Sequence, residues 1–379
     1  MIIQSKRVWL AGQFMPAQLI IKEGQIYKVM PYGSHDVNED YGNKRILPGF
    51  IDIHTHGAYG FDTNDGNPEG LRRWLKRIPE EGVTAILPTT ITQSIEVLEQ
   101  AVKNVATVVH EGYEGAEVLG INLEGPFLSM KYKGAQPAEY IVKPSIEQFE
   151  YLQMKADNMI KMVTVAPEED DDHKFIRYCC RHGIAVSIGH SNASYDEVRM
   201  AIANGASSMT HVFNAMSPLH HRHPGVVGAA LRMREIYGEI ICDGNHVSKD
   251  VLNSFFMAKG SDHGIMVSDS LLLKGMLEGY EGIAGGNLVI LDHNGAAKVK
   301  GTDTLAGSTL KINEGLRILV EEAMVPFEIA LNACSINPAR LLKADDRKGC
   351  LSVGYDADIV VLNDDYSVEM TYTKGRKAF

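Results

Sequence analysis

The sequence lacks the features that mark disulfide-rich, membrane-spanning and secreted proteins. It has only five cysteines among 379 residues, at scattered positions and with no C-x-x-C pair. This pattern argues against a disulfide framework and predicts reduced thiols in a cytoplasmic protein. No apolar run approaches the length that spans a membrane. The first residues carry charges where a secretory signal would be apolar. We therefore expect a soluble protein without a membrane segment.

A basic surface and a dinucleotide-binding fingerprint are also lacking. The chain has 37 Lys and Arg residues against 48 Asp and Glu residues, so its net charge of −11 gives no indication of nucleic-acid binding. No Gly-x-Gly-x-x-Gly follows an early strand, which disfavours the open, doubly wound sheet as an alternative architecture. The apolar content of 45% is that of an ordinary globular protein, and the length suits one large domain with a smaller one.

Both ends of the chain have the period-two alternation of short strands. Near the N-terminus, residues 7–10, 18–21 and 25–29 show this pattern, and Gly24 marks a turn. Near the C-terminus, residues 357–362 and 368–372 show it again. We therefore predict a small β-sandwich domain that is built from residues 1–46 and 350–379.

Between these ends, apolar runs alternate with amphipathic segments. Apolar runs of this kind are typical of strands that are buried on both faces of a parallel sheet. The predicted strands are eight: 46–53, 83–88, 118–123, 160–165, 184–188, 207–211, 237–242 and 263–268. The predicted helices are 69–81, 93–110, 169–182, 194–204, 248–259, 309–322 and 326–334. Eight such strands close a (β/α)8 barrel of the TIM type, which we predict for residues 47–349, with an inserted hairpin at 281–300.

Two histidines one residue apart end the first of these strands. Side chains at positions i and i+2 of a strand point to the same face, so His54 and His56 can converge on one cation. On its own, a His-x-His pair is equally compatible with two ordinary polar residues at the end of a strand.

Further polar side chains follow other predicted strands directly. Glu124, His190 and His211 each come just after an apolar run, and Asp269 follows the eighth one. Taken singly, each could be a helix cap, a loop anion or a satisfied core residue. A barrel gathers the carboxyl ends of its strands at one rim, where such a set of His and carboxylate ligands favours a borderline divalent metal. Asp269 beside the metal could accept a proton from bound water and return it to a leaving group.

Distinctive short blocks lie along nearly the whole chain. They are Leu47–Gly57, 87–90, Glu124-Gly125-Pro126-Phe127, Gly189-His190-Ser191-Asn192-Ala193, His211-Val212-Phe213-Asn214-Ala215-Met216, Pro224-Gly225, 243–247, Ser268-Asp269 and Asn337-Pro338-Ala339. With these blocks the chain resembles the amidohydrolase superfamily, and within it the deacetylases of amino-sugar phosphates. His-x-His is shared by many amidohydrolases, whereas the later blocks are specific in combination.

The resemblance implies a metal centre with assigned ligands. Glu124, His190 and His211 would hold the main ion. His54 and His56 would hold a second one, with Glu124 bridging the two ions and Asp269 nearby. Single-metal relatives have a carbonyl-polarising histidine where this chain has Gln136, so we expect the second ion to take that role here. Zinc and iron are both compatible with these ligands.

The resemblance also implies the substrate and its contacts. Asn214, the backbone N–H of Ala215, Arg222 and His246 would bind a sugar phosphate, with Arg222 and His246 depending on the partner in a homodimer. Gln136 would belong to the same substrate-binding site. The implied reaction is hydrolysis of the acetamide of N-acetylglucosamine 6-phosphate, in amino-sugar catabolism and cell-wall recycling. Three alternatives remain open: the N-acetylgalactosamine epimer, a cyclic amide, and a catalytically silent regulator that binds sugar phosphate. Cyclic-amide hydrolases commonly bridge their metals with a carbamylated lysine, a place that Glu124 takes here.

Overall fold

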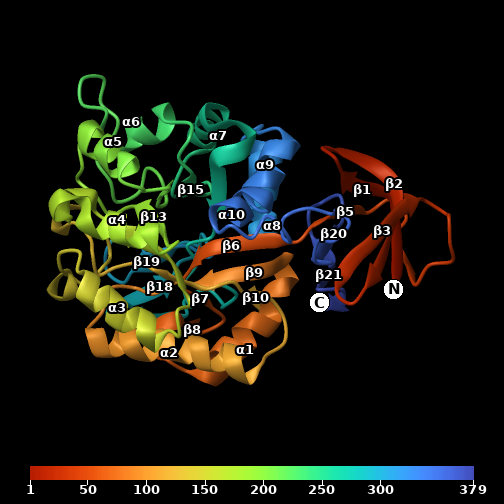
Figure 1. The fold of residues 1–379 in the computed structure, drawn as a ribbon, viewed down its shortest axis with the longest axis horizontal. Coiled ribbons are helices and arrows are strands. Elements are labelled where there is room, and N and C mark those ends of the chain that lie inside the picture. Colours follow the sequence, from red (N-terminus) through yellow and green to blue (C-terminus); the bar gives the residue numbers. More distant parts are fainter.

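A computed structural model describes all 379 residues, Met1–Phe379, as an α/β fold with two distinct groups of strands. Strands from both ends of the chain lie together at one side of the molecule, while the helices surround the other group of strands (Figure 1). No helix combines the length and the apolar character that crossing a bilayer requires.

Eight strands from the two ends of the chain form one hydrogen-bonded sheet, which we call the terminal sheet. Its order is β22-β21-β20-β5-β1-β2-β3, with β4 paired to β1. Alternating apolar side chains give this sheet its own core of 12 buried residues, including Ile3, Leu19 and Tyr372. The strands are β1 (Ile2–Leu10), β2 (Gln13–Lys22), β3 (Gln25–Pro31), β4 (Glu39–Asp40), β5 (Arg45–Pro48), β20 (Ile359–Leu362), β21 (Val368–Thr373) and β22 (Arg376–Lys377).

The central strands are parallel and follow one another in chain order. They form the sheets β10-β9-β6, β11-β12-β13-β14 and β15-β16. A parallel bridge between Thr89 and Asn122 links the first sheet to the second. The Asp269 N–H donates to the carbonyl of His54 at 2.8 Å, which links the end of β16 to β6. The strands are β6 (Phe50–Thr55), β9 (Val83–Pro88), β10 (Glu117–Val118), β11 (Ile121–Leu123), β12 (Ile160–Val165), β13 (Ala185–Ile188), β14 (Ser208–Met209), β15 (Gly238–Ile241) and β16 (Gly264–Val267).

The predicted strand at 46–53 is in fact two strands in different sheets. Leu47 and Pro48 pair with β20 of the terminal sheet, whereas β6 begins at Phe50 and pairs with β9. Gly49 lies between them, and a Cβ there would come within 2.3 Å of the Thr84 side chain. An apolar run continues through the junction, so the sequence pattern does not reveal the change of sheet.

Ten α-helices connect the strands, and three of them were not predicted. The unpredicted helices are α3, α6 and α10; α6 contains two glycines and is mostly buried, so that it lacks the amphipathic pattern. The helices are α1 (Pro68–Arg77), α2 (Ile95–Glu111), α3 (Ile146–Lys155), α4 (Lys174–Arg181), α5 (Tyr195–Ala203), α6 (Gly225–Arg232), α7 (Lys249–His263), α8 (Ile312–Arg317), α9 (Phe327–Ala333) and α10 (Ile336–Leu341).

Two small antiparallel sheets complete the fold. β7 (Gly57–Ala58) pairs with β8 (Phe61–Asp62) directly after the His-x-His segment. The expected hairpin at 281–300 is a three-stranded sheet of β17 (Glu281–Ala284), β18 (Asn287–Leu291) and β19 (Ala297–Val299), which we call the inserted sheet.

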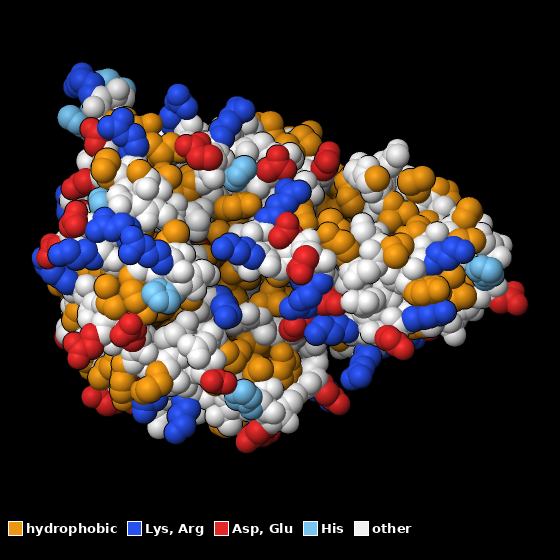
Figure 2. Space-filling view, viewed as in Figure 1, with side chains coloured by type: hydrophobic (Ala, Val, Ile, Leu, Met, Phe, Trp, Pro, Cys, Tyr) orange, Lys and Arg blue, Asp and Glu red, His pale blue; other side chains and the backbone are white.

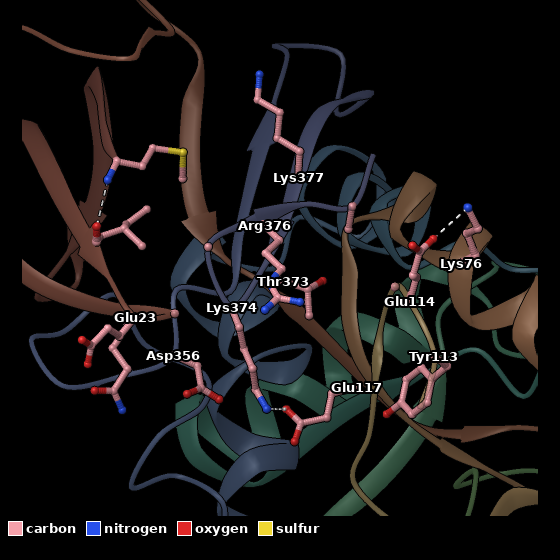
Figure 3. Close-up of a pocket in the computed structure, with 17 residues that line it drawn as sticks. Glu23, Lys76, Tyr113, Glu114, Glu117, Asp356, Thr373, Lys374, Arg376 and Lys377 are labelled. Carbon is pink, nitrogen blue, oxygen red and sulfur yellow. Dashed lines mark hydrogen bonds and ion pairs between the residues drawn. The ribbon is translucent and has the colours of Figure 1, made fainter. Parts of the chain in front are cut away.

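A charged cleft of about 1160 Å³ lies between the terminal sheet and the rest of the molecule (Figure 3). Beside it, Glu117, Asp356 and Asp358 come close enough together to resemble a metal site. The ammonium group of Lys348 lies 2.5 Å from Glu117, 2.9 Å from Asp356 and 2.5 Å from Asp358. A buried lysine therefore already supplies the positive charge, so that this cluster joins the two strand groups through ion pairs.

This ion-pair cluster predicts a stability loss in acid. Burial alone would raise the pKa of Glu117, but Arg347 and Lys348 outweigh it and lower that pKa from 4.5 to about 2. A carboxylate with a depressed pKa contributes its stability above pH 4.5 and loses it as pH falls toward 2. We expect Glu117→Gln to lower the free energy of unfolding at pH 7 by at most about 3 kcal/mol, with the difference vanishing near pH 2. Urea unfolding at both pH values measures this.

Glu114→Gln is the matched control in the same cleft. Glu114 pairs with Lys76 at 2.8 Å, and both side chains are exposed (Figure 3). Exposed ion pairs add little to stability, so this variant should unfold like the wild type at every pH. Equal behaviour of the two variants would contradict the assignment of Glu117 to a stabilising cluster.

Candidate metal centre

Six polar side chains from five strand ends meet in one buried cluster. His54 lies one residue before the end of β6 and His56 follows the strand directly, and their ring centroids are 5.2 Å apart. Glu124 follows β11 directly, and every member of the cluster is at most 8% exposed. His190, His211 and Asp269 lie two residues past β13, β14 and β16. The sequence-predicted ligands are thus adjacent in space.

The cluster divides into two groups of possible ligands. His54, His56 and Asp269 form one triad, and Glu124, His190 and His211 form the other. In each triad the candidate ligand atoms lie within 4.8 Å of one another. This division is the one that the resemblance implies for a binuclear centre.

Glu124 is the side chain that joins the triads. Its Oε1 lies 3.3 Å from the Nε2 of His54, 3.3 Å from that of His190 and 3.2 Å from that of His211. Its Oε2 lies 3.4 Å from the Nε2 of His56. Asp269 completes the other side, with Oδ1 3.0 Å from the Nε2 of His56. A carboxylate in this position can bridge two ions.

All four histidines direct Nε2 toward the centre because Nδ1 has a partner elsewhere. His56 Nδ1 lies 3.2 Å from the Thr89 carbonyl, His190 Nδ1 2.9 Å from that of Tyr132, and His211 Nδ1 3.2 Å from that of Asn214. A carbonyl can only accept, so each of these Nδ1 atoms carries the proton and leaves Nε2 free to bind a metal.

Left-handed backbone conformations turn three of the ligands inward. His190 has φ +48°, His211 φ +25° and Asp269 φ +49°. Non-glycine residues adopt this region at an energetic cost, and such strain concentrates at functional sites.

The electrostatics of the cluster favour positive charge at its centre. Burial alone would lower the pKa of His54, but the charge of Glu124 and hydrogen bonds to carboxylates outweigh it and raise that pKa well above its usual value. Conversely, burial would raise the pKa of Glu124, but the neighbouring histidines hold it well below the ordinary range. Protons on the imidazoles compensate the negative charge of the buried carboxylates, and divalent cations would compensate it as well.

The residues fit a metal in one further respect. His54 Nε2 is buried without a hydrogen-bond partner, although it faces Glu124 and Asp269. A buried polar atom without a partner is costly unless something binds it. Imidazole and carboxylate donors together suit a borderline divalent ion such as zinc or iron.

A cavity of about 190 Å³ opens onto the cluster. Its walls include Gln136, Asn214, Ala215 and His246, four of the residues predicted to contact substrate. The amide nitrogen of Asn214 is buried and has no partner, so it remains available as a donor. His246 is held by Asp243, whose Oδ2 lies 2.7 Å from Nδ1. The cavity thus has candidate metal ligands at its base and hydrogen-bonding groups along its walls.

Gln136 and Arg222 are placed differently from the other predicted substrate contacts. Gln136 donates to Glu124 Oε2 at 2.7 Å and accepts from the N–H of Thr92, so its amide is fixed against the cluster. Arg222 does not line the cavity; it is exposed in the loop before α6. This loop, with the sequence His220-His221-Arg222-His223, protrudes from the molecule, and basic and histidine side chains gather there (Figures 1 and 2). Within one chain, Arg222 and the cavity remain apart.

Two contributions to the site were missed in the sequence. Glu239 lies in the middle of β15 and contacts His54, although a carboxylate inside an apolar strand is itself a signal of a buried partner. The inserted sheet lines the cavity with Ala284, Asn287 and Val289. Asn287 donates to the carbonyl of Ala135 at 2.6 Å, which ties the inserted sheet to the loop that carries Gln136. No local motif marks these cavity positions.

Comparison with known proteins agrees with this geometry. The chain is 42% identical over 337 residues to the N-acetylglucosamine-6-phosphate deacetylase of Bacillus subtilis (strain 168), covering 88% of this chain and 84% of the relative. It is 32% identical to the N-acetylgalactosamine-6-phosphate deacetylase of Escherichia coli O157:H7, covering 95% and 94%.

Solved structures give the same result. The fold matches a mutant N-acetyl-D-glucosamine-6-phosphate deacetylase of Mycobacterium smegmatis in complex with N-acetyl-D-glucosamine-6-phosphate, with a TM-score of 0.94, 28% identity, and coverage of 100% of this chain and 99% of that chain. The model of the amidohydrolase family matches residues 45–378. The chain therefore belongs to the amidohydrolase family.

Proposed function

We propose that this protein hydrolyses the acetamide of N-acetyl-D-glucosamine 6-phosphate to D-glucosamine 6-phosphate and acetate. The observation that carries the proposal is the pair of ligand triads joined by Glu124 on the floor of a cavity with polar walls. The similarity to deacetylases of this substrate supports the same reaction. The reaction belongs to amino-sugar catabolism and cell-wall recycling.

We propose two divalent ions per chain, zinc or iron. Glu124, His190 and His211 would hold one ion, and His54, His56 and Asp269 the other, with Glu124 between them. Bound there, such ions would supply a Lewis acid for the acetyl carbonyl and would lower the pKa of water toward ~7.

The protein's own side chains would bind substrate and move the proton. Asp269 borders the cavity, so it would take the proton from the attacking water and pass it to the departing amine. Asn214, the Ala215 N–H and His246 would donate hydrogen bonds to the sugar phosphate. Gln136 would keep Glu124 oriented, because its amide already binds that carboxylate. No separate side chain is then needed to polarise the carbonyl.

We propose that the enzyme is a cytoplasmic homodimer. Arg222 would complete the phosphate site of a neighbouring copy, since its guanidinium suits phosphate and its protruding loop does not line its own cavity. The five cysteines are all free thiols, which supports a reducing compartment. The molecular mass in solution tests the dimer.

We also propose a closed (β/α)8 barrel at residues 47–349 and a small β-sandwich domain at 1–46 with 350–379. The hydrogen bond between Asp269 and His54 supports closure between the last and first strands. The separate 12-residue core supports the small domain, whose single sheet would fold over onto itself.

Acetate release tests this function directly. We expect turnover of N-acetylglucosamine 6-phosphate, with kcat/KM for the unphosphorylated sugar lower by at least about 10²-fold because charge-assisted phosphate contacts are lost. Metal analysis of the same sample shows whether turnover accompanies bound metal. Binding of the sugar phosphate without acetate release would instead identify a silent regulator.

The galactosamine epimer is a second candidate substrate. The similarity to an N-acetylgalactosamine-6-phosphate deacetylase favours it, since that relative covers 95% of the chain. The two epimers differ at C4, so a comparison of kcat/KM for both in the same assay identifies the preferred one.

A further inference from the structure

Glu239 has an environment that is unusual for a carboxylate. It lies inside β15, and its side chain is fully buried. Its partners are His54 Nδ1 at 2.8 Å and the hydroxyl of Ser187 at 3.3 Å. Burying a carboxylate is costly unless it is paired. The position of Glu239 is therefore explained by its contact with His54.

This contact distinguishes His54 from the other three histidines of the cluster. His56, His190 and His211 each place Nδ1 against a backbone carbonyl. Only His54 places Nδ1 against a side-chain carboxylate. An ionised carboxylate accepts hydrogen bonds and cannot donate, so Nδ1 carries the proton and Nε2 faces the candidate ligands Glu124 and Asp269.

A chain of hydroxyl groups behind Glu239 holds it in place. Ser187 donates to the carboxylate and itself accepts from Thr210 at 2.7 Å. Thr164 lies 3.1 Å from the Thr210 hydroxyl, and all these groups are buried. The carboxylate can therefore not turn away from His54 without leaving buried polar atoms unpaired.

We propose that Glu239 is a positioning residue that controls how tightly the second metal, at His54, His56 and Asp269, is held. The proposal rests on the binuclear centre put forward above. A carboxylate that accepts from Nδ1 fixes the imidazole and increases the basicity of Nε2. It also adds a third negative charge, beside Glu124 and Asp269, to a buried site that would take two divalent cations.

The test is Glu239→Gln, which keeps the size and an acceptor oxygen but removes the charge. After metal loading, wild type and variant are dialysed against graded concentrations of a chelator, and the metal left per chain is measured. We expect the second ion of the variant to bind about 10- to 100-fold more weakly, while the first ion stays bound as in the wild type. Excess metal should restore acetate release, which a misfolded site would not allow.

Two further variants serve as controls for Glu239→Gln. Glu81→Gln removes an equally buried carboxylate that pairs with Lys274 at 3.0 Å and contacts no cluster histidine. It should lower stability but leave the metal content unchanged. In a His54→Asn background, Glu239→Gln should cause no additional metal loss, because the two residues act through one contact.

The measurements distinguish a failure of the proposed role of Glu239 from a failure of the proposed function. A wild type that binds fewer than two metals, or releases no acetate, contradicts the proposed centre or reaction. If the wild type binds two metals and the Glu239→Gln variant resists the chelator equally well, only the proposed role of Glu239 is overturned. Equal metal loss in Glu239→Gln and Glu81→Gln overturns it too, because burial alone would then explain the loss.

Discussion

Replacing Asp269 with asparagine is expected to lower kcat for acetate release by about 10²- to 10⁴-fold, the usual contribution of a general acid–base group. The side chain lies 3.0 Å from His56 Nε2 and borders the cavity, where a water and an amine would exchange the proton. Asparagine keeps an oxygen as a metal ligand but cannot accept that proton. The assay uses metal in excess, and metal content is measured in parallel, because Asp269 is also a candidate ligand.

Asp52→Asn is the matched control for this prediction. Asp52 is also a buried aspartate beside the His-x-His strand, but it binds the Ser268 hydroxyl and does not line the cavity. Burial raises the pKa of Asp52 to about 6, so its neutral form is already accessible near neutral pH. This variant should keep kcat within about tenfold of wild type. A similar kcat in Asp269→Asn would remove Asp269 from proton transfer.

Replacing Glu124 with glutamine is expected to weaken both candidate metal sites at once. Glu124 approaches the Nε2 atoms of all four histidines, so its charge serves both triads. Without that charge we expect both metal sites to weaken and kcat/KM to fall by ~10³-fold or more, since water activation at neutral pH depends on the ions. Metal content after dialysis and acetate release are measured on the same preparation.

A second variant distinguishes the loss of both metal sites from the loss of one. His54→Asn combined with His56→Asn removes two ligands of one triad and leaves Glu124, His190 and His211 intact. It should lose one ion and most activity, whereas Glu124→Gln should lose both ions. Full activity in the double variant would show that the second ion is unnecessary. Unchanged metal content in Glu124→Gln would show that Glu124 does not join the two triads.

The candidate ligands could be predicted from the sequence because each one follows a buried apolar run. The parallel strands of a barrel have their carboxyl ends at the same rim, so residues that directly follow different strands lie close together in space. Alternation along a strand likewise placed His54 and His56 on one face, as the geometry shows. The family was predicted from the motif blocks, and the comparisons confirm it.

The parts that were missed depend on long-range contacts. The contact between Glu239 and His54 joins residues 185 positions apart, and no local motif records it. The left-handed conformations of His190, His211 and Asp269 arise from tertiary packing, because local propensity disfavours them. Helix α6 lacks an amphipathic stripe because it is mostly buried, and the change of sheet at Gly49 lies within a continuous apolar run.

The most direct test of the account is a metal titration of the chelator-stripped protein, followed by acetate release from N-acetylglucosamine 6-phosphate. The two triads predict that the stripped protein is inactive and that turnover rises to a plateau at two equivalents of zinc or iron per chain. Full turnover in the stripped protein, or metal uptake to two equivalents with no acetate released, would contradict the assignment of this cluster as a deacetylase centre.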